Sequence, residues 1–136
     1  MPAFGARSMR NRYTLHESLI GVLDEAILYY DFTILCGHRS KDKQDEAFNN
    51  KRSMVEWPNS KHNTFPSLAV DVAPYYAQPP HIRWNRLYEF VYLHGLIIGL
   101  AARRGITLRS GQNWDMDDEL ITDQGFNDFP HIELVL

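Results

Sequence analysis

Two histidines and two aspartates have the residue types and the spacing to bind and use a metal ion. His62 precedes the segment "LAVDVA", which contains Asp71, and His131 opens the final segment "HIELVL". Two imidazoles and one carboxylate form a ligand set for catalytic zinc, in which water takes the fourth position. Zinc lowers the pKa of such a water from about 15.7 to about 7. Asp128, three residues before His131, is the candidate general base for that water.

The same residues also have a purely structural interpretation. A histidine at the start of a strand is commonly structural or simply exposed. An aspartate such as Asp71 inside a strand is less usual, because strands disfavour it and an unpaired buried charge is costly. Spacing alone leaves the metal site and the structural interpretation both open.

Alternation along the two strands tells whether these side chains can meet. In the first strand, Asp71 lies on the face opposite Val70 and Val72. In the last strand, His131, Glu133 and Val135 lie on the face opposite Ile132, Leu134 and Leu136. If the two strands are neighbours, the candidate ligands converge on one side of the sheet. Glu133 would then be placed to orient a ligand or the substrate.

The remaining sequence predicts an α+β domain, a small antiparallel sheet with flanking helices. Helices are expected over 14–30, with Thr14 as N-cap, over 40–48, with Ser40 as N-cap, and over 84–104. Strands are expected over 32–36, 68–73, 106–110 and 131–136. A single domain spans 1–136, and residues 1–13 are expected to form an N-terminal extension.

Composition narrows the class of protein. A chain of 136 residues that is 44% hydrophobic suits one domain with one core. A net charge of -3 argues against a nucleic-acid partner, and no apolar run is long enough for a membrane span. Cys36 is the single cysteine, so an internal disulfide is excluded, and we interpret it as a small core residue. His94 lies on the apolar side of the predicted helix 84–104 and is interpreted as a core histidine. We expect a monomer made in the cytoplasm, since no signal peptide is present.

Several motifs in a fixed order resemble a known family. They are "GHRSKDKQ", "SKHN", "SLAVDVAPY" and "DFPHIEL", with "LRSGQNWD" between the last two. Together they resemble peptidase family M15, the zinc peptidases of the VanX/VanY and D-alanyl-D-alanine peptidase group. Within that group they are most similar to the phage endolysins that are L-alanyl-D-glutamate peptidases.

The resemblance implies a fold of the Hedgehog/DD-peptidase type and a role for each matching residue. His62, Asp71 and His131 would bind Zn²⁺, and Asp128 would be the base. Arg39 would stabilise the developing oxyanion or bind a substrate carboxylate. The remaining substrate-binding candidates are Gln44, which could instead orient Arg39, Ser60, which could instead shape its loop, and Trp114, expected to line the cleft.

The function implied by this resemblance is zinc-dependent cleavage of peptidoglycan stem peptides, at the L-Ala–D-Glu bond. The expected setting is an endolysin without a separate wall-binding domain, which is released from the cytoplasm through a holin. Two alternatives stay open. One is a D-Ala–D-Ala carboxypeptidase or dipeptidase, and the other is a catalytically silent virion structural or binding protein of the same fold.

Two features depart from the better-known members of the family. The interval "NTFPSL" (63–68) separates His62 from Asp71 by more residues than the usual motif has. The candidate base is Asp128, where the dipeptidases have a glutamate, and its shorter side chain must lie nearer the reacting water. We expect the interval 63–68 to alter substrate fit.

Overall fold

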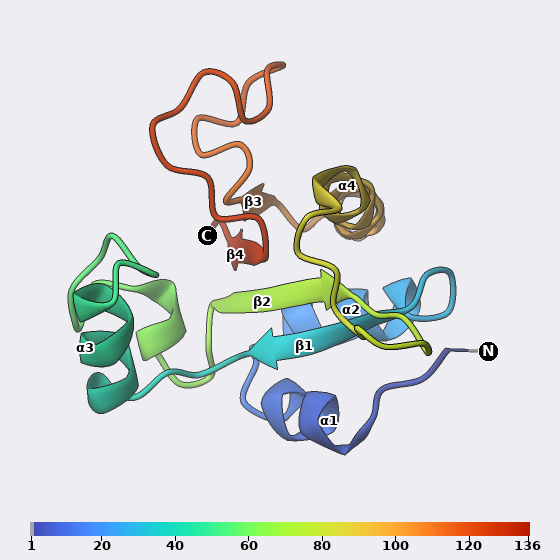
Figure 1. Ribbon diagram of the computed structural model, residues 1–136, viewed down its shortest axis with the longest axis horizontal. Coiled ribbons are helices and arrows are strands. Elements are labelled where there is room, and N and C mark those ends of the chain that lie inside the picture. Colours follow the sequence, from blue (N-terminus) through green and yellow to red (C-terminus); the bar gives the residue numbers. More distant parts are fainter. Residues whose placement is uncertain (1) are drawn as a thin grey trace.

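The sheet is four-stranded and antiparallel, and its strands lie in the order β1 (Phe32–Cys36), β2 (Ala69–Pro74), β4 (His131–Leu134) and β3 (Leu108–Ser110). The computed structural model describes residues 2–136, and Figure 1 shows its arrangement. The elements are α1 (Ala6–Arg12), α2 (Glu17–Ala26), β1 (Phe32–Cys36), α3 (Lys41–Asn49), the 3₁₀ helix η1 (Lys61–Asn63), β2 (Ala69–Pro74), α4 (Leu87–Arg103), β3 (Leu108–Ser110) and β4 (His131–Leu134). The predicted α+β class is confirmed.

One face of the sheet forms the hydrophobic core with α2 and α4. Val70 and Val72 of β2 and Ile132 and Leu134 of β4 are buried in a single cluster with side chains of both helices. Alternation then turns Asp71 of β2 to the opposite face of the sheet. The apolar face therefore fixes which residues are available on the polar face.

Within the N-terminal extension considered from the sequence, residues Ala6–Arg12 form α1, which packs against the sheet. α1 lies along β1, an edge strand of the sheet (Figure 1). The side chain of Asn11 donates to the carbonyl oxygen of Ile34 at 2.7 Å, and the amide of Ile34 donates to the hydroxyl of Ser8 at 2.9 Å. α1 thus supplies partners to backbone groups of an edge strand that would otherwise lack them.

The second helix begins later than predicted because its expected N-cap is used elsewhere. The residues just before this helix pair with Ser67 as a short β-bridge, which keeps them extended. The amide of His16 donates to the carbonyl oxygen of Ser67, and the amide of Ser67 donates to the carbonyl oxygen of Thr14. The N-cap is His16, whose Nδ1 accepts from the amide of Ser18 at 3.1 Å. Thr14 instead accepts a hydrogen bond from the amide of His38 at 2.9 Å.

Other boundaries agree with prediction to within a few residues. Ser40 caps α3 by accepting from the amide of Lys43, as predicted. α4 starts at Leu87, three residues later than expected, and Gly105 follows its end with φ of 73°. β4 ends at Leu134, so the last two residues are exposed. Within residues 2–136, no helix combines the length and apolar character that crossing a bilayer requires.

Candidate metal centre and substrate cleft

The three predicted metal ligands meet on the polar face of the sheet. Asp71 and His131 are directly opposite each other in the register of β2 and β4. His62 reaches them from η1, which precedes β2. Nε2 of His62 lies 3.2 Å from Oδ1 of Asp71 and 3.2 Å from Nδ1 of His131, and the latter two atoms are 3.4 Å apart. We call these three side chains the ligand triad.

The size of this triangle suits a metal ion. Zinc binds nitrogen and oxygen ligands at about 2.0–2.1 Å, so two ligand atoms of a tetrahedral site are separated by about 3.3–3.4 Å. The three interatomic distances in the ligand triad fall close to that value. Three protein ligands also leave a fourth position for water or substrate.

Hydrogen bonds fix the tautomer of each histidine so that its lone pair faces the centre. Nδ1 of His62 lies 2.7 Å from the carbonyl oxygen of Gly37, and Nε2 of His131 lies 2.8 Å from Oε1 of Glu133. Both partners only accept, so each of these nitrogens carries the hydrogen. The other nitrogen of each ring then presents a lone pair toward Asp71. Three acceptor atoms converge on one point, which is an environment for a cation.

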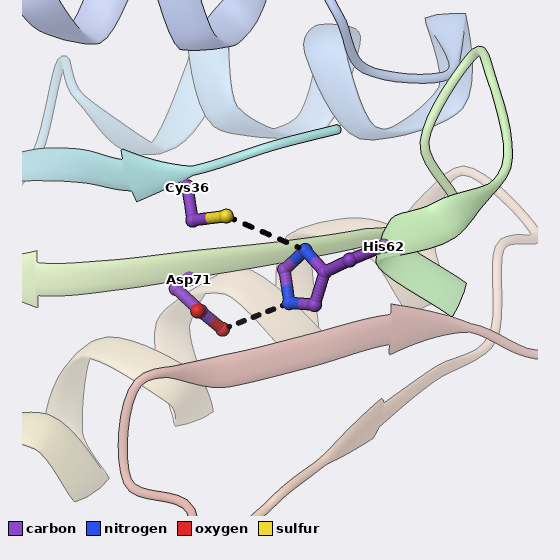
Figure 2. A group of neighbouring side chains, drawn as sticks. All are labelled: Cys36, His62 and Asp71. Atoms are coloured by element: carbon purple, nitrogen blue, oxygen red, sulfur yellow. Dashed lines mark hydrogen bonds and ion pairs between the residues drawn. The ribbon is translucent and has the colours of Figure 1, made fainter. Parts of the chain in front are cut away.

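Cys36 also lies near His62, but on the other side of the ring. Figure 2 shows its sulfur facing Nδ1 at 3.9 Å, while Asp71 faces Nε2. Cys36, His62 and Asp71 have potential ligand atoms within 4.8 Å of one another. Because Nδ1 is occupied by the carbonyl of Gly37, the geometry favours His131 over Cys36 as the third ligand.

Charge and burial strongly shift the pKa values of the ligand triad. Burial lowers the pKa of His62, but the charge and hydrogen bond of Asp71 outweigh it and raise that pKa to about 10. For Asp71 the directions are reversed. Burial raises its pKa, but the charges and hydrogen bonds of His62 and His131 outweigh burial and hold the pKa well below its usual range. In the cation-free protein, protons therefore stabilise this carboxylate. A metal ion would have to displace them, so its binding weakens as the pH falls.

Gly37 packs against the N-terminal segment and is hydrogen-bonded to His62. A Cβ at Gly37 would overlap the hydroxyl of Thr14 and would lie 2.7 Å from the carbonyl oxygen of Asn11. Only a glycine can make this close approach while its own carbonyl accepts from His62. The glycine of the "GHRS" motif is thus explained by packing.

Asp128, the predicted base, is held beside the ligand triad by the segment after β3. Its amide donates to the carbonyl oxygen of Gly111 at 3.0 Å, and the amide of Gly111 donates to that of His131 at 2.8 Å. A Cβ at Gly111 would overlap the backbone oxygen of Asp128 and lie 2.8 Å from its Cβ. Burial, with the charge of Asp71 added, raises the pKa of Asp128 to about 6. Such a carboxylate is a stronger base than an exposed one.

Arg39 is fixed between Asp71 and Gln44. Its Nη2 is 3.4 Å from Oδ2 of Asp71, and its Nη1 donates to Oε1 of Gln44 at 2.9 Å. Gln44 is fully buried and donates to the hydroxyl of Ser53 and the carbonyl oxygen of Val55. Its side chain orients Arg39 and does not line the cleft, so it is not placed for the substrate contact also considered from the sequence.

Ser60 shapes the turn that carries His62. Its hydroxyl accepts from the amide of His62, and its amide donates to Oδ1 of Asn63. The longer interval 63–68 is anchored at both ends, because Asn63 and Ser67 are buried while Phe65 is 70% exposed. The exposed part of this interval contacts His38, whose ring centroid is 5.5 Å from that of Phe65.

Two hollows flank the centre. The first is a cavity of about 450 Å³ that we call the lysine-side cavity; the second, of about 820 Å³, lies beyond Asp128 and Arg39, which line both. The lysine-side cavity is lined by His62 and His131, by Ser60 and Trp114, by the acidic Asp128 and Glu133, and by the basic Arg39, Arg52, Lys61 and Arg109. Trp114 lines it as predicted, with its ring 5.2 Å from that of His131.

A charged network behind His131 was only partly found from the sequence. Oε2 of Glu133 accepts from Nη2 of Arg109 at 2.7 Å and lies 3.2 Å from Nζ of Lys61. Burial raises the pKa of Glu133, but hydrogen bonds from His131 and Arg109 lower it to about 2. Pairing the predicted strand 106–110 with the last strand would have placed Arg109 opposite Glu133, as observed.

A sheet whose polar face carries a buried ligand triad between two hollows is suited to a hydrolase that acts on an extended substrate. The chain matches the model of the family described as phage L-alanyl-D-glutamate peptidase over residues 2–135, and therefore belongs to that family. The resemblance to the phage L-alanyl-D-glutamate peptidases is confirmed. No curated protein matches the chain.

A solved structure has the same fold. It is the L-Ala D-Glu endopeptidase ChiX of Serratia marcescens, with a TM-score of 0.76 and 24% sequence identity. The match covers 98% of this chain and 91% of that one. The similarity therefore extends over the whole domain, α1 included.

The contact between Gly111 and Asp128 generates a specific prediction. Gly111→Ala should push Asp128 away from the centre and lower the rate of peptidoglycan hydrolysis by about 10- to 100-fold, because small misplacements of a reacting group are costly. Metal content should stay unchanged. Gly125→Ala is the matched control, since a Cβ at Gly125 meets nothing within 4 Å. Equal rates for the two variants would contradict the positioning of Asp128 by Gly111.

Proposed function

We propose that the chain is a zinc-dependent endopeptidase that hydrolyses the L-alanyl-D-glutamate bond of bacterial peptidoglycan. The observation that carries this proposal is the convergence of three fixed acceptor atoms at the meeting point of two hollows. Membership of the phage L-alanyl-D-glutamate peptidase family supports the bond. The similar fold of an enzyme described as an L-Ala D-Glu endopeptidase agrees with it.

His62, Asp71 and His131 would hold the metal. Two neutral imidazoles and one carboxylate with an open fourth position are typical of catalytic zinc, although other divalent ions use similar ligands. When bound, zinc supplies Lewis acidity, which polarises the scissile carbonyl and makes water a nucleophile near neutral pH. Gly37 and Glu133 contribute by keeping a hydrogen on the outer nitrogen of each ring, so that the nitrogen facing Asp71 is the one that gives up its proton when the ion binds.

Asp128 is proposed to move the protons of the reaction. Its carboxylate accepts a proton from the attacking water and returns it to the nitrogen of the leaving peptide. A pKa of about 6 suits both steps, because the group is ionised at neutral pH and still basic enough to take a proton. Its burial keeps the carboxylate in a fixed position beside the ligand triad.

Arg39 is proposed to stabilise the negative charge that develops on the carbonyl oxygen. It lines both hollows, so it stands where the scissile bond would cross from one to the other. The hydrogen bonds to Gln44 and Asp71 fix its guanidinium in advance, which is the arrangement that makes such stabilisation effective. Ser60 and Trp114, on the wall of the lysine-side cavity, are proposed to contact the bound peptide.

Analysis of the cleavage products tests the activity and the bond together. Purified peptidoglycan treated with the protein should acquire new amino-terminal D-glutamate. Release of free D-alanine without new D-glutamate termini would instead identify a carboxypeptidase. If neither product forms with the zinc-loaded protein, the alternative of a silent binding protein is correct.

Replacement of each ligand should remove the metal. His62→Ala, Asp71→Ala and His131→Ala are each expected to lower zinc content below about one tenth of the wild-type value, since two remaining ligands hold the ion poorly. Cys36→Ala should retain full zinc content and activity, because its sulfur faces the nitrogen that is bonded to Gly37. Elemental analysis after dialysis measures this. Loss of zinc in Cys36→Ala, with His131→Ala unaffected, would replace His131 by Cys36 in the ligand set.

Asp128→Asn should keep zinc and lose about 10²- to 10⁴-fold in kcat/KM, the usual contribution of a general base. The wild-type kcat/KM should fall about tenfold per pH unit on the acidic side. That limb begins at or below pH 6, because a nearby cation lowers the pKa of about 6 that burial gives Asp128. Metal content at each pH separates protonation of Asp128 from loss of zinc. A wild-type rate in Asp128→Asn would refute its role as the base.

A further inference from the structure

Lys61 and Arg109 form a cationic pair on the wall of the lysine-side cavity. Both contact Oε2 of the buried Glu133, at 3.2 Å for Nζ of Lys61 and 2.7 Å for Nη2 of Arg109. Two positive groups facing one carboxylate leave one positive charge in excess. The two side chains are 33% and 36% exposed, so they are accessible from the cavity.

Arg109 also has an unused hydrogen-bond donor. Its Nε is shielded from solvent and has no hydrogen-bond partner within residues 2–136. Its guanidinium lies 5.7 Å from the ring of Trp114, which borders the same cavity. A buried donor without a partner is costly, so Arg109 is favoured to shift until this donor meets an acceptor, which a ligand in the cavity can supply.

The substrate brings an anion to this region. A glutamate residue has two carboxyl groups, and the next peptide bond uses only one, so the other is a free carboxylate. In an L-alanyl-D-glutamate bond this free group belongs to the residue that contributes the scissile nitrogen. It must therefore lie within a few bonds of the metal centre, on the leaving-group side.

The cationic pair has the position that this carboxylate requires. Lys61 precedes His62 in the chain, and Arg109 is joined to His131 through Glu133. The other basic residues of the cavity are less suited. Arg39 is already held by Asp71 and Gln44, and the side chain of Arg52 is 63% exposed and pairs with Glu46.

We propose that Lys61 and Arg109 bind the free carboxylate of the glutamate and thereby select the bond that is cut. This assignment rests on the proposed function. It also gives the substrate a direction. The glutamate side enters the lysine-side cavity, and the alanine side enters the larger hollow. The basic residues that line only the larger hollow, Arg7, Lys43 and Lys51, are all exposed. Nζ of Lys61 also donates to the carbonyl oxygen of Leu134, so one of its three donors remains for the ligand, and Arg109 keeps the donors that do not contact Glu133.

A pair of synthetic peptides tests the assignment. The first contains the L-Ala–D-Glu bond with the free carboxylate, and in the second this carboxylate is replaced by a neutral carboxamide. Wild-type protein should cleave the first with a kcat/KM about 10- to 100-fold higher, the range for losing hydrogen bonds to a charged group. Arg109→Gln and Lys61→Met should each lower kcat/KM for the carboxylate peptide about tenfold, mainly through KM. The carboxamide peptide should change less than about twofold.

Controls separate charge recognition from support of the metal site. Arg109→Lys keeps a cation and should retain most of the preference for the carboxylate peptide. Arg103→Gln removes an arginine whose side chain is 76% exposed at the end of α4, and should behave as wild type. Zinc content is measured for every variant, because Arg109 also contacts Glu133 and could act on His131.

The outcomes distinguish the two levels of the proposal. Equal cleavage of both peptides by the wild-type protein would overturn the carboxylate assignment and leave the peptidase activity standing. An equal fall for both peptides in Arg109→Gln and Lys61→Met, with or without loss of zinc, would also overturn it, since these residues would then act only through Glu133. Failure of the zinc-loaded wild-type protein to cleave either peptide would refute the proposed function, and this assignment with it.

Discussion

The register between β2 and β4 is the constraint on which the site depends. It sets Asp71 directly opposite His131, and it does so through the apolar residues on the other face of the same strands. A shift of one residue would turn Asp71 into the core and a valine into the site, at a large cost in buried apolar area. The hydrophobic core thus determines the geometry of the ligands without touching them.

A second layer of contacts makes this geometry chemically useful. The carbonyl of Gly37 and the carboxylate of Glu133 decide which nitrogen of each histidine is free. Glu133 is itself held by Arg109, its neighbour across β3 and β4. The sheet therefore carries Asp71 and His131 of the ligand triad. Neighbouring positions of the same sheet carry Glu133, which orients His131, and Arg109, which lines the cleft. Preorganisation of this kind lowers the cost of binding both ion and substrate.

Much of the site could be predicted because it follows from local pattern. Alternation placed Asp71 and His131 on one polar face, and this requires only the period of a strand. The prediction of Thr14 as N-cap of the second helix was wrong, because the backbone of Thr14 pairs with Ser67, which is distant in sequence. The seven residues of α1 are too few for a stable isolated helix, so their structure depends on contact with β1. The role of Gln44 was left open because it depends on Ser53 and Val55, which only the folded chain brings near.

The path from α1 to His62 has a practical meaning for protein engineering. Asn11 and Thr14 pack against Gly37, and Gly37 is bonded to the ring of His62. Figure 1 shows the two chain ends apart, with the C-terminus beside β4, and Leu136 is 89% exposed. A wall-targeting module joined after Leu136 would extend into solvent. Removing α1 would instead take away Asn11, which packs against Gly37, and would thereby disturb the ring of His62.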